Sequence, residues 1–148
     1  MEVQINNRQN KHKISVKKIQ QTARAILNAL DCPDGELSIL IVDDQQIAKL
    51  NTEYLNRKGP TNVIAFPMRE GQFADITPNL LGDVVISVET ACREGNASGI
   101  SMQKSFNQLL VHGILHLLGY DHEKTAKEAK RMEKRSEALQ QMLDEKLD

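Results

Sequence analysis

Three of the four histidines in this 148-residue chain lie close together, in the segment His112-Gly-Ile-Leu-His116-Leu-Leu-Gly-Tyr-Asp-His122. In a helix, His112 and His116 are one turn apart and project from the same face, so both imidazoles can reach one ion. Gly119 permits the turn that would end such a helix and bring the chain back toward it. His122 follows three residues later and is then placed as a third ligand.

Three neutral imidazoles with one open coordination position are typical of catalytic zinc, whereas structural zinc usually has four protein ligands. Leucine and isoleucine flank the histidines, and a dry wall of this kind strengthens the polarising effect of an ion on bound water. The pattern therefore predicts one Zn2+ ion held by His112, His116 and His122. Asp121 is either an outer group that orients a ligand or water, or a residue of the turn, and the sequence leaves both interpretations open.

The histidine segment also matches the metzincin peptidase pattern H-E-x-x-H-x-x-G-x-x-H at every position but one, since Gly113 stands where the glutamate would be. That glutamate is the general base of peptide hydrolysis. The departure disfavours a peptidase and leaves the metal ligands unaffected.

The elements that must position these residues follow from the spacing of apolar residues. Strands are expected near residues 2–6, 36–42, 61–66 and 83–87, with a loop over 68–81. Helices are expected over 16–30, 44–56, 88–96 and 102–118, and from 123 onward; Ser15 and Ser101 are expected N-caps, and Ile47, Leu50 and Tyr54 share a face of the second helix. The last helix is either solvent-exposed, with ion pairs such as Glu123 with Lys127, or a partner-binding helix.

This order of elements predicts an α+β fold, because the helices need a sheet on which to bury their apolar faces. The length fits a single domain over residues 1–148, with a small mixed β-sheet of about four strands packed with about five helices. The metal site then lies at the end of a central helix.

The composition excludes several classes of protein. The longest apolar runs, such as residues 37–42, are far shorter than the roughly 20 residues that span a bilayer, and no signal peptide is recognisable. Cys32 and Cys92 form no C-x-x-C pair, which is typical of two reduced cysteines. A cytoplasmic protein is therefore expected.

Charge is distributed unevenly along the chain. The net charge of -1 disfavours bulk coating of nucleic acid. Residues 1–30, however, carry six basic side chains against Glu2, a net charge of +5, whereas residues 31–120 carry eleven acidic and six basic side chains, a net charge of -5. The N-terminal stretch is either a phosphate-binding surface or a solvated helix face.

The histidine segment, Pro60-Thr-Asn-Val-Ile-Ala-Phe-Pro67 and Leu81-Gly-Asp-Val-Val-Ile86 together resemble the YbeY family of bacterial endoribonucleases. The resemblance covers residues 50–122. It implies a single-strand-specific endoribonuclease that cleaves phosphodiester bonds with a zinc-activated water, in 3′ end maturation of 16S rRNA and in late-stage ribosome quality control. It matches His112, His116 and His122 to the metal ligands, and it implies RNA and a ribosome or ribosomal protein as partners, with no membrane and no DNA.

The chain departs from this family beside Tyr54, where the family usually has an arginine and this chain has Leu55. The nearest arginine is Arg57, which either supplies the cation that stabilises the phosphate from a shifted position or leaves this member acting differently. The catalytic acid and base are not identified, and Arg57 and Asp121 are the candidates for catalytic roles.

Two other functions remain open at this point. One is a different zinc-dependent hydrolase, with a metzincin-like site that lacks the usual glutamate. The other is a non-enzymatic ribosome-associated module, in which zinc only joins the last helices to the sheet.

Overall fold

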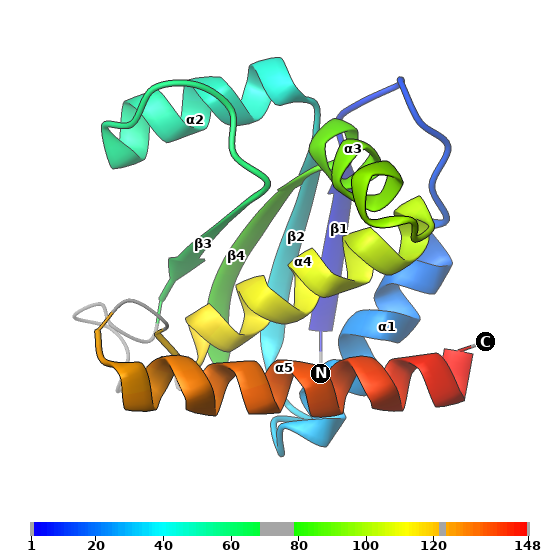
Figure 1. Cartoon of the computed structure of the whole chain (residues 1–148), viewed down its shortest axis with the longest axis vertical. Coiled ribbons are helices and arrows are strands. Elements are labelled where there is room, and N and C mark those ends of the chain that lie inside the picture. Colours follow the sequence, from blue (N-terminus) through cyan, green and yellow to red (C-terminus); the bar gives the residue numbers. More distant parts are fainter. Residues whose placement is uncertain (1, 69–78, 122–123, 148) are drawn as a thin grey trace.

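The computed structural model describes residues 2–68, 79–121 and 124–147, which form a four-stranded sheet and the helices that cover it (Figure 1). The strands are β1 (Glu2–Asn7), β2 (Glu36–Val42), β3 (Val63–Pro67) and β4 (Leu80–Ser87), in the order β1-β2-β4-β3. β1, β2 and β4 are parallel, whereas β3 runs antiparallel to β4 at one edge. The sheet is therefore mixed, as the sequence predicts.

The helices of the described chain are α1 (Val16–Ala29), α2 (Asp44–Leu55), α3 (Val88–Ser98), α4 (Met102–Leu117) and α5 (Ala126–Leu147). The first four begin at side-chain caps, since Ser15, Asp43, Ser87 and Ser101 each accept a hydrogen bond from the backbone N–H three residues on. Such a cap satisfies one of the N–H groups that a helix start leaves unpaired. These elements confirm the predicted α+β fold with five helices.

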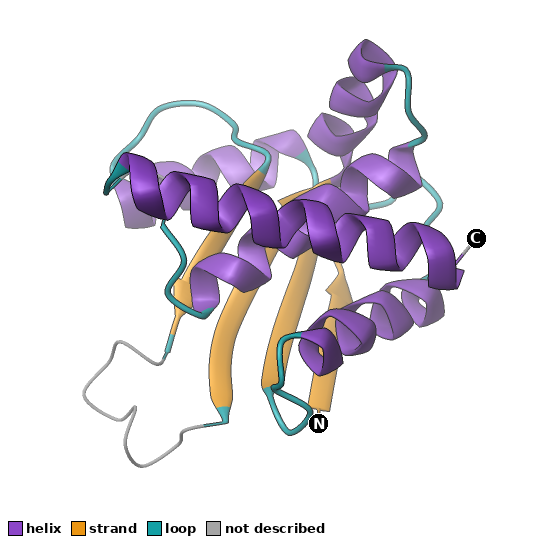
Figure 2. Ribbon diagram, turned by 60° about the horizontal axis from the view of Figure 1, so that its bottom comes forward, coloured by secondary structure: helices purple, strands orange, loops and turns teal. Residues whose placement is uncertain are grey.

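The main core lies between one face of the sheet and the helices α1, α4 and α5, and α3 adds Val88 and Ala91 to it (Figures 1 and 2). α4 is the central helix of this layer, and it contacts β3, β4, α3 and α5. Helix α2 covers part of the other face, where a smaller cluster consists of Val42, Ile47, Ile64 and Val85. Because both faces are covered, β2 and β4 are nearly continuous apolar runs, as is usual for buried parallel strands.

The bounds of β1, β3 and β4 differ from the predicted ones by one to three residues. β4 begins at Leu80 instead of residue 83, and it passes through Gly82, whose φ of +136° and close approach to the carbonyl oxygen of Phe66 require glycine. β3 includes Pro67, which an edge strand tolerates because one side of its backbone has no ladder to complete. Residues 69–78 of the expected loop lie outside the described residues.

Helix α5 is not the solvent-exposed helix that its charge predicts. Met132, Leu139 and Leu143 are buried in the main core, where α5 contacts α1 and α4. The charged residues between them occupy the outer face, so the apolar stripe determines the packing despite a charged composition. Glu123, and with it the expected ion pair to Lys127, lies outside the described residues.

Two further expectations concern single features. Cys32 and Cys92 are both free thiols. None of the helices in the described ranges combines the length and the apolar content that crossing a bilayer requires.

Candidate active site

His112 and His116 occupy successive turns of α4 and face each other. Their Nε2 atoms are 3.0 Å apart, and the ring centroids are separated by 4.5 Å with 68° between the ring planes. Both side chains are half-buried at the C-terminal end of the helix. The two imidazoles therefore converge on one point, as their spacing predicts.

The distance between these nitrogens fits a shared metal ion. Two nitrogens bound to one tetrahedral zinc ion at roughly 2.0–2.1 Å lie about 3.3 Å from each other, and the observed 3.0 Å is close to that value. The same contact is also compatible with a hydrogen bond between the rings, with donor and acceptor set by the tautomer.

The third expected ligand, His122, lies outside the described residues. Within the ranges that the structure describes, no three His, Cys, Asp or Glu side chains gather as a metal site would require. The complete three-histidine site therefore stays a prediction, of which the structure places two members.

A Schellman motif ends α4 directly after His116. The N–H of Gly119 donates to the carbonyl of His116 at 3.0 Å, and the N–H of Tyr120 donates to the carbonyl of Leu115 at 3.0 Å. Gly119 has a φ of +94°, which favours glycine. The guanidinium of Arg131 in α5 lies 4.7 Å from the ring centroid of Tyr120 and ties the turn to the last helix.

Gly113 explains why the metzincin glutamate is missing here. A Cβ at this position would lie 2.6 Å from Cγ1 of Val84 and 3.3 Å from Cγ2 of Val63, because α4 packs closely on β3 and β4. A glutamate would point into the sheet and would bury its carboxylate in an apolar core. The close packing of α4 on the sheet thus gives a physical reason for the absence of the peptidase glutamate.

A cavity of about 590 Å³ opens at the two histidines, between α4, β3 and the segment that follows α2. Its charged lining residues in the described chain are Arg57, Asp121 and Lys124. The structure thus brings both predicted catalytic candidates to the histidines, with Asp121 half-buried and Arg57 exposed. Leu55, at the position of the family arginine, also lines the cavity.

Lys124 is a cavity residue that the sequence did not single out. Its place in a charged C-terminal run conceals it, and the signal that could have found it is its position two residues after His122. With Arg57 it gives the described lining of the cavity two cations against one carboxylate. Such a lining favours an anionic ligand.

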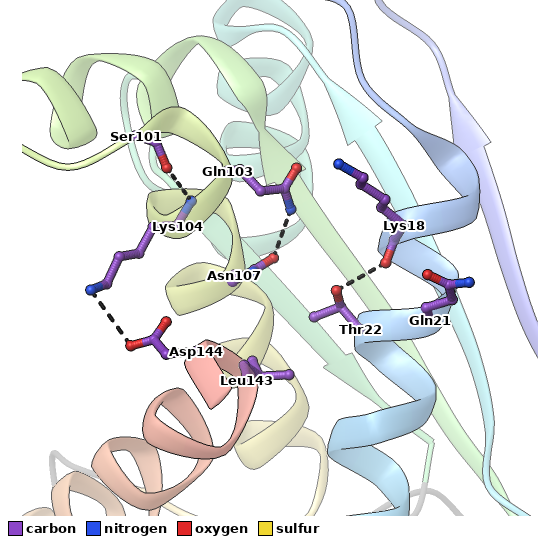
Figure 3. Close-up of a pocket in the computed structure, with 9 residues that line it drawn as sticks. All are labelled: Lys18, Gln21, Thr22, Ser101, Gln103, Lys104, Asn107, Leu143 and Asp144. Carbon is purple, nitrogen blue, oxygen red and sulfur yellow. Dashed lines mark hydrogen bonds and ion pairs between the residues drawn. The ribbon is translucent and has the colours of Figure 1, made fainter. Parts of the chain in front are cut away.

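The basic N-terminal stretch does not reach this cavity, since none of residues 2–30 lines it. Lys18 instead lines a separate cavity of about 330 Å³ between α1, α4 and α5 (Figure 3). There the ammonium of Lys104 lies 3.6 Å from the carboxylate of Asp144. Lys11 forms ion pairs with Glu89 at 3.4 Å and Asp43 at 3.9 Å. Any cations that hold a phosphate at the histidines must come from later in the chain.

A network of charged and polar side chains lies away from the histidines and joins α2 to α3. Asp44 accepts hydrogen bonds from Ser87 Oγ, Thr90 Oγ1 and Arg93 Nη1, each at 2.6 Å. Burial raises the pKa of the Asp44 carboxyl, but the hydrogen bonds and the charge of Arg93 lower it by more, so the pKa lies below its ordinary value. This network is therefore structural, and it fixes the end of the sheet from which α2 and α3 start.

The fold and the site together define a class of protein: an α+β domain whose central helix presents two convergent imidazoles to a cavity with cationic side chains. The Endoribonuclease YbeY family matches this chain over residues 4–144. The chain is 49% identical over 138 residues to Endoribonuclease YbeY of Syntrophotalea carbinolica, covering 93% of this chain and 92% of that protein. It is 45% identical over 145 residues to Endoribonuclease YbeY of Geobacter sulfurreducens, covering 97% of both. The chain belongs to the Endoribonuclease YbeY family.

A solved structure supports the fold independently. The solution structure of a Thermotoga maritima protein superposes with a TM-score of 0.67 at 22% sequence identity, over 93% of this chain and 86% of that one. At this identity the likeness concerns the fold alone.

Proposed function

We propose that this protein is a zinc-dependent, single-strand-specific endoribonuclease that acts in the cytoplasm on small-subunit rRNA. Its proposed roles are maturation of the 3′ end of 16S rRNA and late-stage ribosome quality control, in association with the ribosome or a ribosomal protein. The observation that carries the proposal is the convergence of His112 and His116, with Nε2 atoms 3.0 Å apart, in a cavity that Arg57 and Lys124 also line. Membership of the Endoribonuclease YbeY family supports RNA as the substrate.

The metal would be held by Nε2 of His112 and His116, with His122 as the further ligand. When bound, zinc supplies a Lewis acid that polarises a phosphoryl oxygen and provides a nucleophile near neutral pH. The chain's own contribution is a preformed pair of ligands, because the helix fixes both rings before any ion arrives. Both imidazoles must be neutral for this role.

The phosphate is proposed to bind to the cations of the cavity. The planar guanidinium of Arg57 can donate two parallel hydrogen bonds to phosphate oxygens, and Lys124 adds a point charge. These groups would stabilise negative charge that develops on the phosphate during cleavage. Asp121, the acidic residue among the described lining, would orient a water or a ligand by accepting a hydrogen bond.

The position of the histidines supports a preference for single strands. Both rings are half-buried between α4 and β3, so a phosphodiester must enter the cavity to reach them. A flexible single strand can present its backbone in this way, whereas a paired helix is held away by its own width.

The test is zinc analysis together with cleavage of a single-stranded precursor that contains the 3′ end of 16S rRNA. We expect the wild type to bind one zinc ion and cleave, and His116→Ala to lose both zinc and cleavage. His12→Ala, a histidine in the N-terminal segment, is the matched control and should retain both. Retained cleavage by metal-free His116→Ala would overturn the mechanism, and a zinc-loaded wild type that cuts no RNA but unfolds on chelation would indicate a structural zinc module instead.

A further inference from the structure

A second cavity adjoins the histidine cavity at His112. This second cavity has a volume of about 470 Å³ and lies between β3, α3 and α4. Asn62, Val63 and His112 line both cavities. Its size falls within the roughly 300–1,000 Å³ of small-molecule sites. A polymer bound at the histidines can therefore extend past His112 into it.

The two cavities differ in charge. Arg57 and Lys124 line the first, whereas Glu94 is the only charged residue among the described residues that line the second. The other polar groups there are uncharged, such as the amides of Asn62 and Gln108. A phosphate is attracted to the first cavity and repelled from the second, so the second suits an uncharged part of a nucleotide.

The exposed carboxylate of Glu94 accepts hydrogen bonds from the residue that directly precedes β3. Nδ2 of Asn62 donates to Oε1 and Oε2 of Glu94 at 3.3 and 3.2 Å. Asn62 is itself fixed, because its Oδ1 accepts from the Val63 N–H at 2.8 Å and its carbonyl accepts from the Ser87 N–H at 3.0 Å. A carboxylate offers about four acceptor positions, so Glu94 retains acceptors for a ligand.

We propose that the second cavity is a nucleobase subsite in which Glu94 selects guanine next to the phosphodiester held at the histidines. This proposal rests on the RNA cleavage proposed above. A carboxylate only accepts hydrogen bonds, and the N1–H and N2–H groups of guanine present two parallel donors to it. Uracil presents one N–H between two carbonyl oxygens, which the carboxylate repels, so uracil is the least favoured base.

The first test maps cleavage sites in a single-stranded RNA pool with random bases, by sequencing the product ends. We expect guanine enrichment over uracil of about fivefold at one fixed position beside the cut, the low end of what a bidentate contact gives. Glu94→Gln should lose this preference while it still cleaves, and Glu133→Gln, an exposed glutamate of α5, should keep it. An unchanged preference in Glu94→Gln, or no preference in the wild type, would overturn the subsite.

The second test does not depend on cleavage. NMR of the full chain would follow the side-chain amides of Asn62 and Gln108 during titration with guanosine or uridine 5′-monophosphate. We expect the guanine nucleotide to shift both amides in the wild type, the uracil nucleotide to leave them unchanged, and Glu94→Gln to lose the difference. Equal responses to both nucleotides, or no response to either, would reject the subsite even if RNA cleavage is established. A selective response to the guanine nucleotide in a protein that cleaves no RNA would reject only the proposed activity.

Discussion

Gly113 in α4 lies directly against Val84 in β4, leaving 2.6 Å between Cγ1 of the valine and the Cβ that any larger residue would add. The contact brings the central helix close to the sheet. It also places position 113 on the core face of α4, while the neighbouring His112 lines the cavity. Because Gly113 has no side chain, α4 can pack closely on the sheet, and this packing determines where His112 and His116 lie.

Gly113→Ala should therefore destabilise the protein. The added methyl overpacks a stiff valine, which typically costs about 1–3 kcal/mol, and the helix propensity of alanine offsets about 1 kcal/mol of this. We expect a net loss of about 1 kcal/mol in the free energy of unfolding, measured by urea titration. In the matched double variant with Val84→Ala, the alanine at 113 should cost less than it does alone; equal costs in both backgrounds would contradict the contact.

Zinc affinity should fall in acid, because both imidazoles must lose their protons to bind the ion. Lowering the pH from about 7.5 to about 5.5 should therefore weaken zinc binding, which competition with a coloured chelator can measure. An affinity that is constant over this range would argue against histidine ligands.

Leu55→Arg should raise the rate of RNA cleavage. Leu55 lines the histidine cavity and is 40% exposed, so an arginine there can add a cation without removing a core contact. We expect about a tenfold gain in kcat/KM, smaller than the effect of a fully buried donor. Leu55→Gln, of similar length but uncharged, is the control. A variant with arginine that is no faster would show that Arg57 already supplies the charge.

Asp44→Asn should remove an acid-sensitive part of the stability. Since the pKa of folded Asp44 lies below its ordinary value, the carboxylate contributes stability above the unfolded pKa, near 3.9, and this is lost as the pH falls through the folded pKa. In urea titrations, the advantage of wild type over Asp44→Asn should be largest near neutral pH and should shrink below about pH 4. Asp34→Asn, in an exposed turn, is the control. A difference that stays constant with pH would mean that the network acts through packing alone.

Leu139→Ala in α5 should cost about 2–5 kcal/mol, the usual range for a buried leucine. Lys134→Ala, on the exposed face of the same helix, should change stability by less than about 0.5 kcal/mol. Thermal unfolding of both variants measures the difference. Similar melting temperatures for the two variants would show that α5 contributes little to the core.

The sequence predicts the elements well where the information is local. Ser15 and Ser101 cap helices as expected, and the strand over residues 36–42 has the expected bounds, because capping and apolar periodicity are properties of neighbouring residues. Helical spacing predicts which residues share one face of a helix, but it does not predict which other elements pack against that face. Tyr54, expected on the same face as Ile47, is 66% exposed, and its ring meets the ring of Phe66 edge-on with 5.8 Å between the ring centroids.

The candidate site also has one part that the local sequence predicts and another part that it does not. The facing of His112 and His116 follows from one helical turn, whereas the approach of Arg57 and Lys124 depends on how distant segments meet. The pair of Asn62 and Glu94 is separated by 32 residues and joins the segment before β3 to α3. No local pattern encodes such a contact, since it depends on the packing of α3 and α4 beside the edge strand.

The close packing of α4 couples the site to the global stability of the protein. His112 and His116 share this helix with Ile114 and Leu115, which are fully buried in the main core. The pair of rings cannot separate by local fraying without exposing that core, so a ligand held by both rings binds the folded state preferentially. Its concentration should then raise the midpoint of whole-chain unfolding, by an amount that grows with the logarithm of ligand concentration. Ligand binding at the two histidines and folding of the whole chain are therefore thermodynamically linked.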